Sequence, residues 1–353
     1  MDNKKRGPGA GICTAACALI VGAQALWSGA ALAQDGQAQL VLGGGSTFAA
    51  PLFERWIERY EAEHADIDVE YDAIGSGEGI SRFLVGSLDF AATDAPMSPE
   101  QEAAIDGGVS HIPVTAGAIV VAYNLPGDQE GELRLPRAIL GDIFAGEIRS
   151  WNDERIADAN PDLDLPKRSI TVVARVDGSG TTYAFTNHLN AASPAWQATG
   201  LGAATIADWP GTAILGQGNE GVAVNILRGD GTIGYVEYGF ASRLGLPMAT
   251  LENAAGDFVA PAPESASVAI GAADLPDDLK IELPDPQGEG AYPIVTFTWS
   301  LLRNQASGAR ADAAAAFISY AVVDGQSEAA DLGYVPLPES VQKGAATALA
   351  ALR

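Results

Sequence analysis

The sequence predicts an α/β fold of two domains, and three observations lead to that prediction. Short apolar, β-rich segments alternate with amphipathic segments of helical period, a pattern typical of sheets covered by helices. Residues 34–353, the 320 that follow a predicted export signal, are more than one hydrophobic core usually organises. These residues contain no cysteine, so burial of apolar side chains rather than disulfide bonds must stabilise them.

The export signal is predicted at residues 1–33. A basic start, KKR at 4–6, is followed by an apolar run over 12–26 and by the small-residue pattern ALA, where a signal peptidase would cut. The apolar run is too short and too rich in Ala and Gly for a membrane span of about 20 residues. Both cysteines, Cys13 and Cys17, fall in this segment, and the TAA before Cys17 is a poor match to a lipoprotein cleavage box. We therefore expect an exported, periplasmic protein.

The chain is strongly acidic, with 20 Lys and Arg residues against 45 Asp and Glu residues and a net charge of −25. Removal of residues 1–33 takes away three cations and one anion, so the mature net charge becomes −27. Nucleic acids and acidic membrane surfaces need basic patches, so we expect neither as a partner. A small anion is still allowed, because local dipoles can bind it and surface charge is screened over about 8–10 Å.

The individual elements follow from the period of the apolar residues. Segments rich in Val, Ile, Thr and aromatic residues predict strands, and apolar residues three or four positions apart predict helices. The helix at 50–64 is the clearest, because its apolar side chains fall on one face: Leu52, Phe53, Trp56, Ile57 and Tyr60. In chain order we expect strands at 39–42, 67–74, 117–125, 169–176, 232–240 and 292–302, and helices at 50–64, 78–86, 137–146, 181–192, 219–229 and 309–322. The Ala-, Pro- and acid-rich stretch 252–290 predicts loop and irregular helix.

Four segments share one design, in which a strand passes through Gly, Ser, Thr or Asp into a helix start or a turn. They are LGGGSTFAAP at 42–51, AIGSGEGI at 73–80, AATDAPMSPE at 91–100 and RVDGSGTT at 175–182. We call them the first to fourth corners. Helix N-termini offer unpaired N–H groups and partial positive charge, so several of them aimed at one point would bind an oxyanion without a metal. One corner alone is more simply a helix cap or turn, but four in one chain, one carrying Arg175, favour an anion site.

The sequence contains no motif typical of nucleotide binding, of a catalytic serine or of a metal site. The chain has no G-x-x-x-x-G-K-[ST], and GSGEG lacks the third glycine of a dinucleotide fingerprint. DGSGT is not the nucleophile motif G-x-S-x-G. The three histidines, His64, His111 and His188, have neither metal-ligand spacing nor an evident pairing with Ser179. We therefore expect no metal, no cofactor and no nucleophilic role for Ser179.

At these corners the sequence resembles the PstS family, the phosphate-binding proteins of bacterial phosphate ABC transporters. The family patterns G-x-G-[AS]-T-F-x-x-P, I-G-S-[SG]-x-G, D-F-[GA]-x-[ST]-D-x-P and R-x-D-G-S-G-T-[ST] stand here as GGGSTFAAP, IGSGEG, DFAATDAP and RVDGSGTT. LGDIFAGEIRSWND and GNEGV with IGYVEY match two further family segments, so the resemblance covers nearly the whole mature chain. It implies a two-lobe periplasmic binding fold of type II, with two crossing strands and the ligand in the cleft between the lobes.

The resemblance also implies where the lobes and the ligand residues lie. Lobe I would comprise 34–118 and 294–353, and lobe II would comprise 119–293, with AIVVAYN and YPIVTFTW as the crossing strands. Asp177 would hold Arg175 in position. The phosphate-binding residues carried over from the family are Thr47, Phe48, Ser76, Asp94, Arg175, Ser179, Gly180 and Thr181.

Asp94 is the unusual member of this set, because it is an acid at an anion site. Phosphate near neutral pH keeps at least one proton, which a carboxylate can accept, whereas sulfate has none. A buried acceptor without a donor costs about 1–3 kcal/mol, so we expect Asp94 to favour phosphate over sulfate. Its alternative role is to cap the helix that follows. Glu78 departs from the family, where many relatives carry a small neutral residue, and we expect its side chain to face solvent.

The resulting prediction is a periplasmic solute-binding protein that captures inorganic phosphate by hinge closure. It would deliver phosphate to the permease and ATPase subunits of an ABC transporter, act as a monomer and have no enzymatic activity. Arsenate, which is close to phosphate in shape and protonation, is expected to bind as well. Three alternatives stay open: a secreted phosphatase or phosphoesterase, a surface or adhesion protein that reuses the fold, and a binder of another oxyanion.

Overall fold

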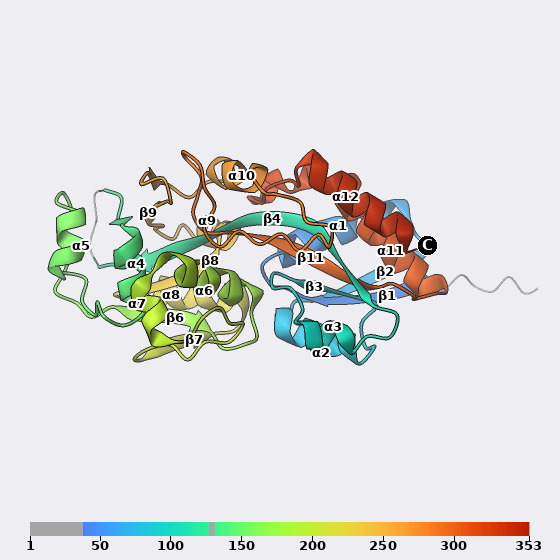
Figure 1. Ribbon diagram of the computed structural model, residues 1–353, viewed down its shortest axis with the longest axis horizontal. Coiled ribbons are helices and arrows are strands. Elements are labelled where there is room, and N and C mark those ends of the chain that lie inside the picture. The colour runs from blue at the N-terminus through green and yellow to red at the C-terminus, as the bar shows by residue number, and fades with distance from the viewer. Residues whose placement is uncertain (1–37, 127–130, 353) are drawn as a thin grey trace, which may run out of the picture. The chain divides into compact units, whose positions relative to one another are not determined.

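The computed structural model describes residues 38–126 and 131–352, so the predicted export signal lies outside the described residues. The described chain is built around one eight-stranded mixed sheet of strand order β2-β1-β3-β11-β4-β8-β6-β7, with helices packed against it (Figure 1). A second sheet holds three short strands in the order β10-β9-β5. The predicted α/β class is confirmed. Within the described ranges, no helix has the length and apolar character that a membrane crossing requires.

The bounds of the elements are as follows. The strands are β1 (Gln39–Gly45), β2 (Ile67–Asp72), β3 (Phe90–Thr93), β4 (Val109–Asn124), β5 (Arg134–Leu135), β6 (Thr171–Arg175), β7 (Ala213–Gly216), β8 (Thr232–Glu237), β9 (Thr250–Glu252), β10 (Phe258–Val259) and β11 (Val295–Arg303). The helices are α1 (Ala50–Glu63), α2 (Ser76–Leu84), α3 (Pro99–Ala103), α4 (Arg137–Phe144), α5 (Glu154–Ala159), α6 (Gly180–Ala192), α7 (Pro194–Thr199), α8 (Gly218–Arg228), α9 (Tyr238–Arg243), α10 (Pro263–Gly271), α11 (Ala309–Val323) and α12 (Glu339–Ala351). Two short 3₁₀ helices, Gly325–Glu328 and Ala330–Leu332, lie between α11 and α12.

Strand β4 joins the two parts of the large sheet. Up to Ala118 it pairs antiparallel with β11, and from Ile119 onward it pairs antiparallel with β8. The Ile119 N–H donates to the Ile294 carbonyl at 2.9 Å, next to the point where the chain returns into β11. The chain thus crosses between two lobes at two adjacent places. The first lobe is built on β2, β1, β3 and β11, and the second on β8, β6 and β7 (Figure 1).

Each lobe has an aromatic cluster that fixes the helix leading away from the candidate site. In the first lobe, Phe53 of α1 stacks on Tyr71 with ring centroids 4.5 Å apart, and lies 5.9 Å from Phe90. In the second lobe, Phe185 of α6 stacks on Tyr235 of β8, also at 4.5 Å. Such rings bury large apolar areas and prefer defined geometries. The clusters therefore hold the N-termini of α1 and α6 at the carboxyl ends of β1 and β6.

Two strands differ from their predicted bounds for identifiable reasons. β4 begins eight residues before the predicted start at 117, although Pro113 lies inside it. The pairing of β4 with β11 shifts register between Thr298 and Trp299, opposite Pro113, and such a bulge accommodates proline within a sheet. β8 ends at Glu237 rather than at 240, because the Glu237 carboxylate accepts the first N–H groups of α9 and starts that helix.

The predicted irregular stretch 252–290 is more regular than expected. It contains the nine-residue helix α10 and the short strand β10, joined by loop on either side. The helix begins with a proline at its first position, which favours helix initiation. The sequence signal was weak because α10 has no clear apolar stripe.

Replacement of Phe53 by alanine tests the first-lobe cluster. The ring is fully buried, so Phe53→Ala should lower the free energy of unfolding by about 3–5 kcal/mol. The measurement is guanidinium unfolding followed by circular dichroism. Phe258→Ala is the control, because 40% of that residue is exposed, and its effect should stay below about 1 kcal/mol. Equal losses in the two variants would contradict the assignment of Phe53 to the core.

Candidate anion-binding site

The four predicted corners meet where the carboxyl ends of parallel strands from the two lobes face each other. In the first lobe β1 runs parallel to β2 and β3, and in the second β6 runs parallel to β7 and β8. Loops beyond the carboxyl ends of such strands are the usual ligand sites of open α/β sheets. The Gly77 N–H donates to the Gly178 carbonyl at 2.8 Å, so the second and fourth corners contact each other directly across the lobes.

Glycine is needed for this close approach at two positions. Gly75 has φ of 90°, and a Cβ added there would lie 2.3 Å from Oδ2 of Asp177. A Cβ on Gly180 would lie 2.6 Å from Oγ of Ser76 and 2.7 Å from Cβ of Asp94. Any larger residue would push the lobes apart. The described structure is therefore a closed arrangement of the corners.

Two hydroxyl groups of the predicted set sit on helix starts and already accept a hydrogen bond. Oγ of Ser76, the first residue of α2, accepts from the Asp94 N–H at 3.3 Å. Oγ of Ser179 caps α6 by accepting from the Thr182 N–H at 3.0 Å. A hydroxyl has one hydrogen to donate, and neither of these hydrogens has an acceptor in the described part of the chain. Both are left as donors.

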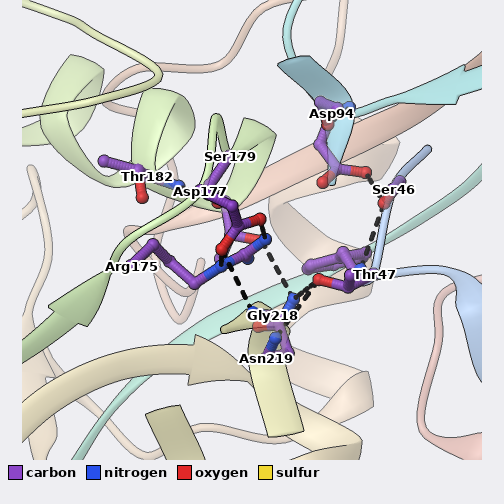
Figure 2. A network of polar contacts seen from close by, with 12 residues as sticks. Ser46, Thr47, Asp94, Arg175, Asp177, Ser179, Thr182, Gly218 and Asn219 are labelled. Carbon is purple, nitrogen blue, oxygen red and sulfur yellow. Dashed lines mark hydrogen bonds and ion pairs between the residues drawn. The ribbon is translucent and has the colours of Figure 1, made fainter. Parts of the chain in front are cut away.

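The hydroxyl groups of Thr47 and Thr181, which lie on opposite lobes, also accept hydrogen bonds. Their donor is Asn219, a residue that the sequence analysis did not single out. The side-chain Nδ2 of Asn219 donates to Oγ1 of Thr47 at 3.0 Å (Figure 2). It also donates to Oγ1 of Thr181 at 3.2 Å. The backbone N–H of Asn219 also donates to Oγ1 of Thr47, at 3.2 Å. Among the described residues, neither threonine hydroxyl has an acceptor for its own hydrogen. All four hydroxyls are nine-tenths buried or more.

Arg175, at the end of β6, is buried and is held by Asp177. Its Nε donates to Oδ1 of Asp177 at 2.8 Å, and its Nη2 pairs with Oδ2 (Figure 2). The Gly218 N–H adds a third bond to this carboxylate at 3.1 Å. Burial raises the pKa of Asp177, but the hydrogen bonds and charge of Arg175 outweigh it and the pKa lies below its usual value. The pair is ionised, and Nη1 of Arg175 has no hydrogen-bond partner in the described chain.

Asp94 presents one free oxygen. Its Oδ1 accepts from Oγ of Ser46 at 2.6 Å and from Oγ1 of Thr298 at 2.7 Å, while Oδ2 has no donor among the described residues. Burial raises the pKa of Asp94 to about 6, although those two hydroxyls and Arg175 act to lower it. Asp94 is therefore ionised at neutral pH. The alternative that it caps the next helix is wrong, because Ser98 caps α3 through a capping box.

Phe48 and Glu78 lie at the edge of this arrangement. The Phe48 N–H, expected to face the ligand, donates to Oγ of Ser46 at 3.1 Å. Glu78 is exposed in the first turn of α2, and its Oε1 accepts from Nε of Arg82 at 2.8 Å. The expected solvent-facing orientation of Glu78 is confirmed.

Three other buried titratable groups carry little charge: Glu237, His111 and His188. Burial raises the pKa of Glu237 to about 8, although the N–H groups of Gly239 and Phe240 act to lower it, so this carboxyl is largely protonated at neutral pH. Burial lowers the pKa of His111 and of His188 to about 4, which leaves both rings neutral. Nowhere in 38–126 or 131–352 do His, Cys, Asp and Glu side chains gather into a group that could hold a metal ion.

The sequence analysis did not identify Asn219 as a site residue, because the strand before it is too short to be recognised. β7 has four residues at the edge of the sheet, with Ile214 and Leu215 partly exposed, so no clear apolar period marks it. Recognition of β7 would have made LGQGNEG at 215–221 a fifth corner of the same design as the other four. Its glycine, Gly218, has φ of 64° and starts α8, which places Asn219 against the first corner.

Comparison with known proteins agrees with this geometry. A family model described as the PBP superfamily domain matches residues 29–324. The phosphate-binding protein PstS of Xylella fastidiosa strain 9a5c is 37% identical over 306 residues, covering 86% of this chain and 83% of the relative.

Solved structures share the fold at lower identity. A phosphate-binding protein from Stenotrophomonas maltophilia aligns with a TM-score of 0.71 at 17% identity, covering 88% of this chain and 93% of its own. The high-affinity periplasmic phosphate-binding protein PfluDING, solved with phosphate bound, aligns with a TM-score of 0.69 at 22% identity, covering 86% of this chain and 92% of its own. The likeness extends over both lobes, so the two-lobe type II fold expected from the sequence is confirmed. With the corners in place and a relative this similar over most of its length, the chain belongs to the PBP superfamily and, within it, to the PstS family of phosphate-binding proteins.

Proposed function

We propose that this protein binds inorganic phosphate between its lobes and delivers it to the permease and ATPase subunits of an ABC importer. One observation carries the proposal: the corners of the described chain offer several hydrogen-bond donors and one open carboxylate oxygen as acceptor. The donors are hydroxyl groups and Nη1 of Arg175, which suit the oxygens of an oxyanion, and the acceptor is Oδ2 of Asp94, which suits a protonated oxygen. The name of the Xylella relative supports the same ligand.

The proposed ligand set combines both lobes. Asp177 aims Arg175, and the Phe48 N–H shares its hydrogen between Ser46 and the anion. The N–H groups of Gly180 and Thr181 at the start of α6 add helix-terminal donors. The set as a whole is Thr47, Phe48, Ser76, Asp94, Arg175, Ser179, Gly180 and Thr181.

We propose further that the lobes part where β4 changes its pairing partner from β11 to β8. The first boundary would fall between 118 and 119, where the pairing of β4 passes from β11 to β8. The second would fall between 293 and 294, where the Ile294 carbonyl accepts from the Ile119 N–H. The protein would act as a monomer in the periplasm, and arsenate would compete with phosphate for the same donors.

We take the protein to be a binding protein rather than a phosphatase. Oγ of Ser179 accepts from the Thr182 N–H, and no side chain in the described residues is placed to remove its proton. The buried His188 is occupied elsewhere, because its Nδ1 donates to the Pro284 carbonyl at 2.9 Å.

Isothermal titration calorimetry with phosphate is the direct test. The protein, freed of residual ligand by partial unfolding and dialysis, should bind phosphate at micromolar concentration or tighter with a stoichiometry near one. Arsenate should displace phosphate, and sulfate should bind at least about fivefold more weakly. Absence of phosphate binding in a correctly folded preparation would overturn the proposal, and preference for sulfate would reassign the ligand.

Asp94→Asn should remove discrimination against sulfate. Above about pH 7 the wild-type carboxylate faces sulfate with no donor between them, a cost of about 1–3 kcal/mol or roughly 5- to 150-fold in affinity. Because the pKa of Asp94 is raised to about 6, this cost should fade in the wild type as the pH drops through that value. The phosphate-to-sulfate affinity ratio is measured by competition from about pH 5 to pH 8.

In Asp94→Asn the ratio should be low and nearly independent of pH, because the amide resembles the protonated acid. Asp106→Asn is the matched control, since that carboxylate is exposed, and should keep the wild-type profile. A variant at position 94 with an unchanged profile would remove Asp94 from its role.

Turnover of a chromogenic phosphate ester separates the binding protein from the phosphatase. We expect none above background in the wild type, and Ser179→Ala should weaken phosphate binding by about tenfold, because one charged-ligand hydrogen bond is lost. Turnover that Ser179→Ala abolishes would instead support the enzyme.

A further inference from the structure

We propose that Asn219 is a positioning residue, which aims the hydroxyl hydrogens of Thr47 and Thr181 at the bound anion and latches the two lobes together. This inference rests on the proposed function and deepens it. Asn219 itself would not touch the ligand. It lies in the second position of α8 and is 99% buried, since only 1% of its surface is exposed.

The orientation of the Asn219 amide is fixed by its third partner. The backbone N–H of Glu237 donates to Oδ1 of Asn219 at 3.0 Å, and a backbone N–H can only donate. The amide oxygen must therefore face Glu237, and the NH₂ group must face the two threonines. If the amide were rotated by 180°, its NH₂ group would face the backbone N–H of Glu237, and that hydrogen bond would be lost. The amide oxygen would then face the hydroxyl groups of Thr47 and Thr181.

This orientation sets the direction of both hydroxyl groups. Oγ1 of Thr47 receives two hydrogen bonds from Asn219, at 3.2 Å from the backbone N and 3.0 Å from Nδ2. A hydroxyl oxygen has two acceptor sites, so both are filled and only the hydrogen is left to point elsewhere. Oγ1 of Thr181 receives one bond at 3.2 Å, which turns its hydrogen away from Asn219 in the same manner.

The same contacts join the lobes. Thr47 follows β1 in the first lobe, and Asn219 is the second residue of α8 in the second lobe (Figure 2). Thr181 is the second residue of α6, also in the second lobe. The bonds to Thr47 therefore exist only while the lobes are closed, and the bond to Thr181 is independent of closure. Loss of Asn219 should accordingly destabilise the closed complex more than it hinders encounter with the anion.

A groove beside this contact indicates the side on which the site opens. It has a volume of about 720 Å³, runs between α1, α8 and α9, and is lined by residues that include Thr47, Gly218 and Asn219. Of the proposed ligand set, Thr47 is the member that lines it among the described residues. The Thr47–Asn219 contact thus borders the groove, and its rupture would open the site toward the groove.

The test compares phosphate association and dissociation rates, by stopped-flow fluorescence of the full chain, in the wild type and in variants of Asn219. Asn219→Ala should raise the dissociation rate about tenfold or more and change the association rate by less than about threefold. Asn219→Asp should weaken binding further, because a carboxylate would accept the hydroxyl hydrogens and turn them away from the anion. Asn225→Asp, the same change on the same helix outside the site, should stay within about twofold of the wild type.

A double-mutant cycle distinguishes positioning from a merely structural role. If Asn219 acts through the Thr47 hydroxyl, then Asn219→Ala in a Thr47→Val background should cost much less affinity than it does in the wild type. Additive losses would overturn the inference, as would wild-type dissociation in Asn219→Ala. Thermal unfolding of each variant without phosphate first establishes that the variant is folded. If Asn219→Asp does not fold, the double-mutant cycle of Asn219→Ala with Thr47→Val decides. A wild type that binds no phosphate would overturn the proposed function and this inference with it.

Discussion

The hydroxyl groups of Thr47, Ser76, Ser179 and Thr181 each accept a hydrogen bond from an N–H group, and the character of the site depends on this constraint. The donors come from different places: a strand end for Ser76, a helix start for Ser179 and the Asn219 amide for both threonines. Each hydroxyl is left with its own hydrogen to donate, and in Thr47 both acceptor sites of the oxygen are filled. Asp94 is built the opposite way, since hydroxyl groups saturate one of its oxygens and leave the other open. The result is a surface rich in hydrogen-bond donors, on which one carboxylate oxygen is left open to accept.

This arrangement explains how a chain with a net charge of −25 can hold an anion. The site has no excess of positive charge, because Asp177 balances Arg175 and Asp94 is ionised at neutral pH. Attraction must come from oriented dipoles at helix starts and from hydroxyl groups, which act over a few ångströms in a buried place. Hydrogen-bond type, rather than charge, is then the property that separates one oxyanion from another. The pKa of Asp94 is raised because burial removes water from its carboxylate and so destabilises the charged form.

Sequence reasoning succeeded where local physics is strong. The stripe that contains Phe53 and Trp56 defined α1. The small-residue corners pointed to an anion site because four of them occur in one chain and one carries Arg175. It failed where tertiary structure decides. The bulge that admits Pro113 into β4, the carboxylate of Glu237 that ends β8, and the short edge strand β7 leave little local signal. Asn219 could not be assigned a role because its partners come from three separate segments of the chain.

The continuity of β4 through both lobes limits how those lobes can move. A slide of one lobe past the other would shift the register of an entire hydrogen-bonded ladder, since β4 is paired along its length with β11 and then with β8. A rotation about the point between Ala118 and Ile119 breaks far fewer bonds. The lobes can therefore move easily in essentially one way, by a change in the angle between them. A motion described by a single angle brings the corners back to the same mutual position each time they meet.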